Sequence, residues 1–364
     1  MAVASKIQRS RTENGRKDFV GVWSQHSIFT LIFSINEVGR IFMDLQPEEL
    51  QHLGPLAILR QAVTIARSSP KHFAALTLVL VFPLSFAILA HSLITHPLLA
   101  QLHHRHDSSS GSSPLAALLV FQSLYLLFLF SFSLLSTGAV VYSVACLYTS
   151  KSISFSALLS AIPRLLKPLF HTFLWVFFLM FLYYAAFVLC LLLALIFVDN
   201  DDDSFSLGIV LVIFFLGVFF GFLHIYIAAI WHLASVISVL EDSYGLAAMK
   251  KSRELLKGKM ALAGMLVFVY LVACAIIGMI FSNVVVRGGE EYSTGVKFIV
   301  GFVLVGLLVL VNLVGLLVQS VFYYVCKAYH HQGIDKSALY DHLGGYLGEY
   351  VPLKSSIQME SLDM

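Results

Sequence analysis

Two histidines stand out in the fourth apolar stretch of the chain, where polar side chains are otherwise rare. The histidines are His224 and His232. At helical spacing they share one face with three small residues, Gly217, Gly221 and Ala228. Small residues let helices approach closely, and polar groups inside an apolar span need partners. The pattern predicts either a packing face with satisfied histidines or a cleft that binds a lipid or another solute.

The sixth apolar stretch carries a second polar face, formed by Asn312, Gln319 and Tyr323. These residues are also spaced for one side of a helix, so the fourth and sixth stretches are plausible neighbours. Hydrogen bonds between them would fit a purely structural role as well as a binding role. We take these three residues, with His224 and His232, as the candidate intramembrane polar face.

Signatures of catalysis are missing from the sequence. No phosphate-binding loop, nucleophile elbow, zinc-protease motif or paired Cys-x-x-Cys occurs. Asp and Glu are absent from the interiors of the apolar stretches, which counts against a proton- or sodium-coupled transporter. We therefore expect no enzymatic activity, no cofactor and no metal site, while a pathway for a lipid or neutral solute stays open.

Composition assigns the chain to the membrane. Of its 364 residues, 59% are apolar and 12% are charged, against roughly 45–50% and about 25% in soluble domains. The formal net charge of +2 excludes a generally basic nucleic-acid binder. Six apolar stretches are long enough to span a bilayer: 73–93, 115–141, 169–198, 205–235, 261–286 and 296–324. The predicted fold class is an all-α polytopic bundle of six transmembrane helices.

The basic residues set the expected orientation. Of the 23 Lys and Arg residues, 20 lie before the first stretch, in the second and fourth connections, or after the sixth stretch. The positive-inside rule then places both termini in the cytoplasm. We expect the protein to reside in the endomembrane system or the plasma membrane.

Amphipathic segments precede the first, third and fifth stretches. The wheels of 56–67 and 246–257 share one register, and 155–167 is a looser third copy. We expect a threefold repeat, each unit an amphipathic cytoplasmic interfacial helix followed by two spans; the alternative is that these segments are only the ends of long transmembrane helices. Their basic residues would contact anionic lipid headgroups: Arg60, Arg67, Lys250, Lys251 and Lys257.

Three regions are expected along the chain. Residues 1–42 are a disordered or dispensable extension, 43–326 the six-span membrane domain and 327–364 a cytoplasmic tail. The tail holds two Tyr-x-x-apolar patterns, at 340–343 and 350–353, which fit sorting signals read by protein partners. The alternative is an ordered cap beneath the bundle.

The run 239–258, VLEDSYGLAAMKKSRELLKG, resembles a motif in the membrane domain fused to bacterial glycerophosphoryl diester phosphodiesterases. The soluble catalytic barrel of such enzymes has no counterpart here. From Met43 onward the chain is more similar to a family of uncharacterised plant multi-pass membrane proteins. That similarity is carried by four segments: 43–50, 82–92, 231–236 and 341–346.

Two functions follow as hypotheses. The first is a non-enzymatic endomembrane scaffold or adaptor that organises lipids or partner proteins through its basic cytoplasmic face. The alternative is a transporter or lipid-translocating protein that uses a cleft between the fourth and sixth spans. A cavity with polar groups would favour the alternative, and a solid bundle with a basic belt would favour the scaffold.

Overall fold

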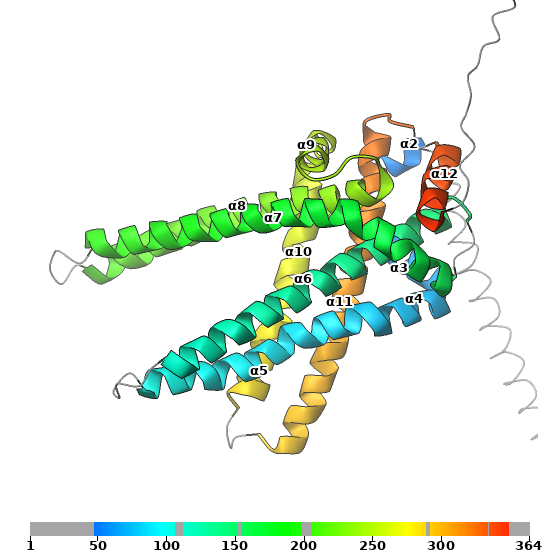
Figure 1. Ribbon diagram of the computed structural model, residues 1–364. Helices are drawn as coiled ribbons and strands as arrows, with labels where there is room; N and C mark the ends of the chain where they lie inside the picture. Colours follow the sequence, from blue (N-terminus) through cyan, green and yellow to red (C-terminus); the bar gives the residue numbers. More distant parts are fainter. Residues whose placement is uncertain are drawn as a thin grey trace, which may run out of the picture.

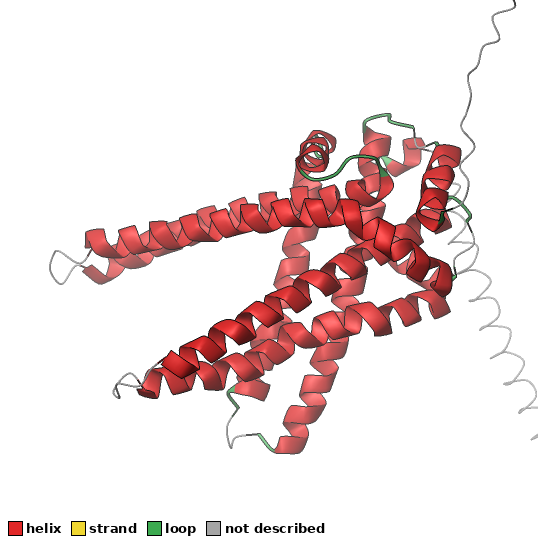
Figure 2. Ribbon diagram, in the orientation of Figure 1, coloured by secondary structure: helices red, strands yellow, loops and turns green. Residues whose placement is uncertain are grey.

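The computed structural model describes residues 47–105, 112–151, 154–198, 205–288, 292–333 and 335–348. Within these residues all regular structure is helical (Figure 2). Six helical segments are long and apolar enough to cross a membrane: Pro70–Leu98, Ala116–Tyr148, Phe155–Ile196, Val210–Leu240, Met260–Val286 and Thr294–Tyr329. The six-span all-α prediction is confirmed. The predicted extension, 1–42, lies outside the described residues.

The spans form three helical hairpins (Figure 1). The first contains α4 (Pro70–Leu76), a π-helical turn (Thr77–Val81), α5 (Phe82–Arg105) and α6 (Ser112–Tyr148). The second contains α7 (Phe155–Val198) and α8 (Phe205–Leu240). The third contains α10 (Met260–Phe281), a π-helical turn (Ser282–Val286) and α11 (Thr294–Tyr329).

The three hairpins pack together at one end and separate from one another toward their loops (Figure 1). We call these the packed end and the open end. Short helices gather at the packed end: α2 (Pro47–Leu50), α3 (Pro55–Ser68), α9 (Leu246–Leu255) and α12 (Lys336–Leu347). Fully buried side chains such as Ile58, Leu165, Ile237 and Tyr324 concentrate there. The distal parts of α7 and α8 expose most of their apolar side chains, which a bilayer would cover.

Local sequence explains the boundaries of the short helices. Pro55 occupies the first turn of α3 and Pro70 that of α4, where the missing N–H costs nothing. The Asp335 carboxylate accepts hydrogen bonds from the backbone N–H groups of Ser337 and Ala338, which starts α12. Gly348, with φ of 78°, ends it in the left-handed conformation.

The second amphipathic segment is not a separate helix. It forms the start of α7, which continues through Pro163 and Pro168 without an interruption in the helix assignment and changes direction in its first part (Figure 1). Proline bends a helix without ending it where neighbouring helices support the freed carbonyls. The chain does break between α3 and α4, at Ser69 and Pro70. The segment 155–167 is therefore continuous with the third span, whereas 56–67 forms a helix of its own.

The apolar face of α9 is buried against protein. Ala248, Ser252 and Leu255 are buried, and the Ser252 hydroxyl donates to the Ile230 carbonyl of α8 at 2.7 Å. The corresponding face of α3, with Ile58, is also buried in the protein core. These faces are therefore used for packing within the chain, while their polar sides remain exposed.

Candidate functional site

A cavity of about 670 Å³ lies where the three hairpins meet. Its walls come mainly from α6, α8, α10 and α11, and Pro55, Leu56 and Leu59 of α3 form part of its margin. Most of the lining is apolar, and no Asp, Glu, Lys or Arg among the described residues lines it. The cavity's polar side chains come from four helices: Ser133, Ser136 and Thr137 of α6, His224, His232 and Ser235 of α8, Tyr270 of α10, and Asn312 and Gln319 of α11.

The structure brings His232 and Gln319 together across this cavity. His232 Nδ1 lies 2.9 Å from Gln319 Oε1, which joins α8 to α11. The other end of the amide, Nε2, is buried without a hydrogen-bond partner, and so is the hydroxyl of Ser136 on α6. An unpartnered buried polar group typically costs about 1–3 kcal/mol. Two such groups therefore line one cavity.

Both polar atoms of the Asn312 amide take part in a hydrogen-bond network within the protein. Its Nδ2 donates to the Ser85 hydroxyl of α5 at 2.8 Å, and its Oδ1 accepts from the Tyr270 hydroxyl of α10 at 2.9 Å. Ser85 in turn donates to the Val81 carbonyl at 2.8 Å. This network ties three spans together, so Asn312 has a structural role at the cavity wall.

The face of α8 that carries the glycines and histidines divides into two parts. His224 and Ala228 line the cavity, and the His224 ring lies 5.6 Å from that of Tyr183. A Cβ built at Gly217 or Gly221 meets no atom within 4 Å. The expectation that these glycines pack against another helix is therefore wrong within this chain, because the hairpins have already diverged at their level.

Tyr323 lies outside the cavity lining and belongs to a charged cluster at the packed end. Its hydroxyl donates to Glu241 at 2.6 Å, Lys327 lies 2.8 Å from the same carboxylate, and Lys251 of α9 forms an ion pair with it. Burial alone would raise the pKa of Glu241, but hydrogen bonds from its three donors outweigh burial and hold the pKa below its ordinary value. Glu241 thus stays charged at neutral pH.

Sequence patterns contain little indication of the Glu241 cluster. Glu241 follows the fourth span directly, and its partners Tyr323 and Lys327 lie more than 80 residues later. One signal was available: a carboxylate at the end of an apolar helix, followed by a basic segment. Only the fold shows which of the Lys residues reach it.

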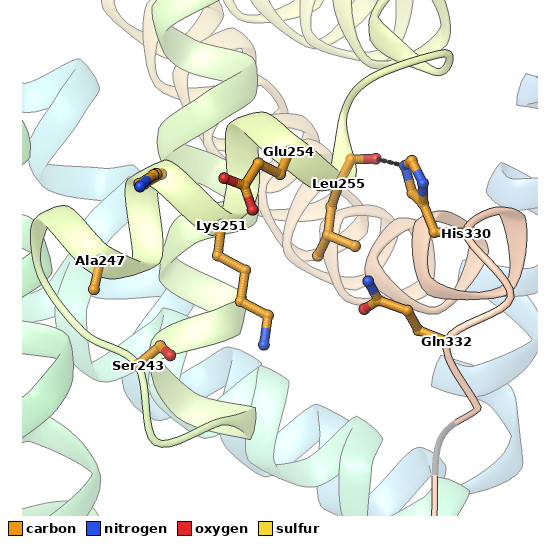
Figure 3. A pocket seen from close by; sticks show the side chains of 8 residues that line it. Ser243, Ala247, Lys251, Glu254, Leu255, His330 and Gln332 are labelled. Atoms are coloured by element: carbon orange, nitrogen blue, oxygen red, sulfur yellow. Dashed lines mark hydrogen bonds between the residues drawn. The ribbon is translucent and has the colours of Figure 1, made fainter.

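The candidate headgroup contacts are divided between solvent and protein. Arg60 and Arg67 of α3 and Lys250 and Lys257 near α9 are exposed, whereas Lys251 is held by Glu241. A second pocket, of about 370 Å³, lies between α9 and the end of α11. Figure 3 shows Lys251 and Glu254 on its α9 side and Gln332 opposite, with His330 donating to the Leu255 carbonyl at 3.0 Å. Because Glu254 also lines it, this pocket is not uniformly basic.

The first tail motif forms part of an ordered cap. Its Leu343 is fully buried in α12, and Tyr340 is exposed. Tyr346 donates to the Val239 carbonyl at 3.1 Å, and Arg164 donates to the Gly345 carbonyl at 3.1 Å. Burial raises the pKa of Tyr346 to about 12, with a smaller contribution from Asp242. The second motif, 350–353, lies outside the described residues.

The part of the chain that the structure describes contains no assembled metal site and no disulfide. No three His, Cys, Asp or Glu side chains there are grouped for a metal ion. The four cysteines, Cys146, Cys190, Cys274 and Cys326, form no disulfide bond.

Six apolar spans around a shared core define an integral, multi-pass helical membrane protein. The chain belongs to the family described as the domain of unknown function DUF8558, whose model matches residues 43–362. No curated protein and no solved structure matches the chain. The family match begins at Met43, where the expected membrane domain begins, but these comparisons do not support the resemblance to phosphodiesterase membrane domains or a plant origin.

Proposed function

We propose that this protein binds a lipid inside its membrane domain and holds or passes it there, without enzymatic activity of its own. The observation that carries this proposal is the cavity between α6, α8, α10 and α11. Its volume of about 670 Å³ falls within the roughly 300–1,000 Å³ of ligand pockets. An apolar lining with a few polar groups suits an amphipathic molecule.

The surroundings of the cavity favour entry from the bilayer. Met265, Val269 and Leu310 line the cavity and are also exposed, at 42%, 60% and 57%. Leu56 at the α3 margin is 79% exposed. Exposed apolar side chains on a membrane span contact lipid chains. A lipid could therefore move from the bilayer into the cavity over a continuous apolar surface.

The scaffold hypothesis is the second candidate, and the exposed basic residues favour it. Arg60, Arg67, Lys250, Arg253 and Lys257 are all exposed. With the packed end facing the cytoplasm, as the distribution of basic residues predicts, each could attract anionic headgroups. The C-terminal tail offers a further place for protein partners. Both roles are compatible with the same lipid-binding membrane domain.

Native mass spectrometry of the detergent-purified full chain tests lipid binding. We expect a mass increment of one lipid that survives delipidation better than annular lipid. Ala228→Phe places a large ring in the cavity and should reduce the retained fraction, whereas Ala185→Phe, at an exposed position on α7, should not. Equal retention by both variants, or no retained lipid in the unaltered protein, would contradict the proposal.

A further inference from the structure

We infer that the cavity selects an uncharged lipid with a free hydroxyl group, which Ser136 and Gln319 bind by hydrogen bonds. This inference rests on the proposed lipid-binding function and adds the chemical class of the ligand. Both side chains line the cavity, are at least nine-tenths buried, and carry a polar atom without a partner.

Ser136 differs from other serines of its own helix. Ser123, Ser131 and Ser143 each donate to the carbonyl four residues earlier, at 2.7–2.8 Å. This is the usual way in which an intramembrane serine satisfies its hydroxyl. Ser136 is completely buried and makes no such bond. Its hydroxyl is therefore free to bind a ligand.

Gln319 has one free end whichever way its amide is turned. One end bonds His232, and the other has no partner. Turning the amide exchanges the free donor for a free acceptor. A ligand hydroxyl satisfies either arrangement, because it both donates and accepts. An ester carbonyl only accepts, so it would satisfy just one of them.

The charge of the lining excludes a charged headgroup. The described lining residues include no Asp, Glu, Lys or Arg. A phosphate or ammonium group would lose its hydration there without gaining a countercharge. A hydroxyl loses much less, and the two unpartnered side chains replace its bonds to water.

The position of Ser136 and Gln319 along their helices also favours an uncharged ligand. Gln319 lies ten residues before the end of α11 at Tyr329, and Ser136 lies twelve residues before the end of α6 at Tyr148. At 1.5 Å per residue these positions are roughly 15–18 Å from the helix ends. Both positions lie inside candidate membrane spans rather than at their ends, so a charged headgroup there would have to leave water, whereas a small hydroxyl loses much less hydration.

The test compares lipids that differ only in the hydroxyl. The full chain is placed in phosphatidylcholine nanodiscs containing dioleoylglycerol, cholesterol or the methyl ether of either, and bound lipid is counted by native mass spectrometry. We expect dioleoylglycerol or cholesterol to bind about five- to tenfold more tightly than its own ether, the effect of about one hydrogen bond. The pair with the larger preference identifies the lipid class. Stronger binding of dioleoylphosphatidic acid would overturn the inference.

Matched serine variants separate binding from structure. Ser136→Ala should abolish most of the preference for the hydroxyl lipid without lowering the melting temperature, because it removes an unpartnered buried group. Ser320→Ala removes a buried hydroxyl that is bonded to its own helix outside the cavity, and should leave the preference unchanged. Gln319→Leu should also reduce the preference, although it releases His232.

The outcomes distinguish this inference from the function on which it rests. If neither hydroxyl lipid outcompetes its ether, or if Ser136→Ala leaves the preference intact, the hydroxyl inference is wrong while lipid binding stands. If none of the lipids is retained and Ala228→Phe has no effect, both are wrong.

Discussion

Neutralising Glu241 should destabilise the packed end strongly. The Glu241 side chain is 12% exposed and that of Lys327 16%, so Glu241→Gln leaves a nearly buried ammonium group without its countercharge. Removing one partner of a buried pair costs about 3–5 kcal/mol. Lys251 is 38% exposed and can turn to solvent, so its share is small. We expect a loss of about 2–4 kcal/mol in the free energy of unfolding.

The assay is unfolding of the purified protein in mixed micelles by sodium dodecyl sulfate. Glu254→Gln is the matched control, because Glu254 is exposed on the adjacent helix α9. It should change the free energy by less than about 0.5 kcal/mol. Adding Lys327→Met to Glu241→Gln should recover part of the loss, since the unpaired charge is then gone. Equal effects of the two Gln variants would refute the reasoning.

The contribution of Glu241 to the free energy of unfolding should depend on pH with a definite sign. The pKa of Glu241 is lower in the folded protein than its ordinary value of 4.5. Its contribution to stability is therefore complete above pH 4.5 and is lost as the pH falls through the lowered folded pKa. The difference in stability between the unaltered protein and Glu241→Gln should be constant from pH 6 to 8 and shrink only in acid.

Three further predictions concern packing, orientation and the N-terminus. Gly221→Leu should change stability by less than about 0.5 kcal/mol, while Gly315→Leu should cost about 1–3 kcal/mol because a Cβ there lies 3.2 Å from the Tyr270 ring; a severe effect at Gly221 would show that another molecule covers it. Glycosylation acceptors in a lengthened 199–204 loop should be modified and acceptors at either terminus should not, so a glycosylated C-terminal tag would contradict the orientation. A chain that begins at Met43 should still insert into membranes, and failure to insert would show that the preceding residues are needed.

The spans were predictable because the bilayer sets a length and an apolar composition that sequence shows directly. The predicted stretch 261–286 and the observed span Met260–Val286 differ by one residue. The pairing of the fourth and sixth spans also followed from their polar residues, and the structure joins them through His232 and Gln319. Polar groups in apolar helices have few alternatives to one another, which makes such pairings readable.

The divergence of the hairpins could not be predicted from the same patterns. Lipid and protein are both apolar surroundings, so a helical wheel does not show which apolar face is covered by protein. The glycines at 217 and 221 are the clearest case, since their spacing suits helix packing but their surroundings are open. The unpartnered Ser136 was equally hidden, because its sequence context resembles that of the bonded serines in the same helix.

Electron cryomicroscopy of the full chain in lipid nanodiscs tests the central claim most directly. The account predicts elongated density between α6, α8, α10 and α11, with its polar end beside Ser136 and Gln319 and its chains leading toward Met265 and Leu310. A cavity that is empty in a map resolving these side chains, or one closed by collapse of the four helices onto each other, would contradict it.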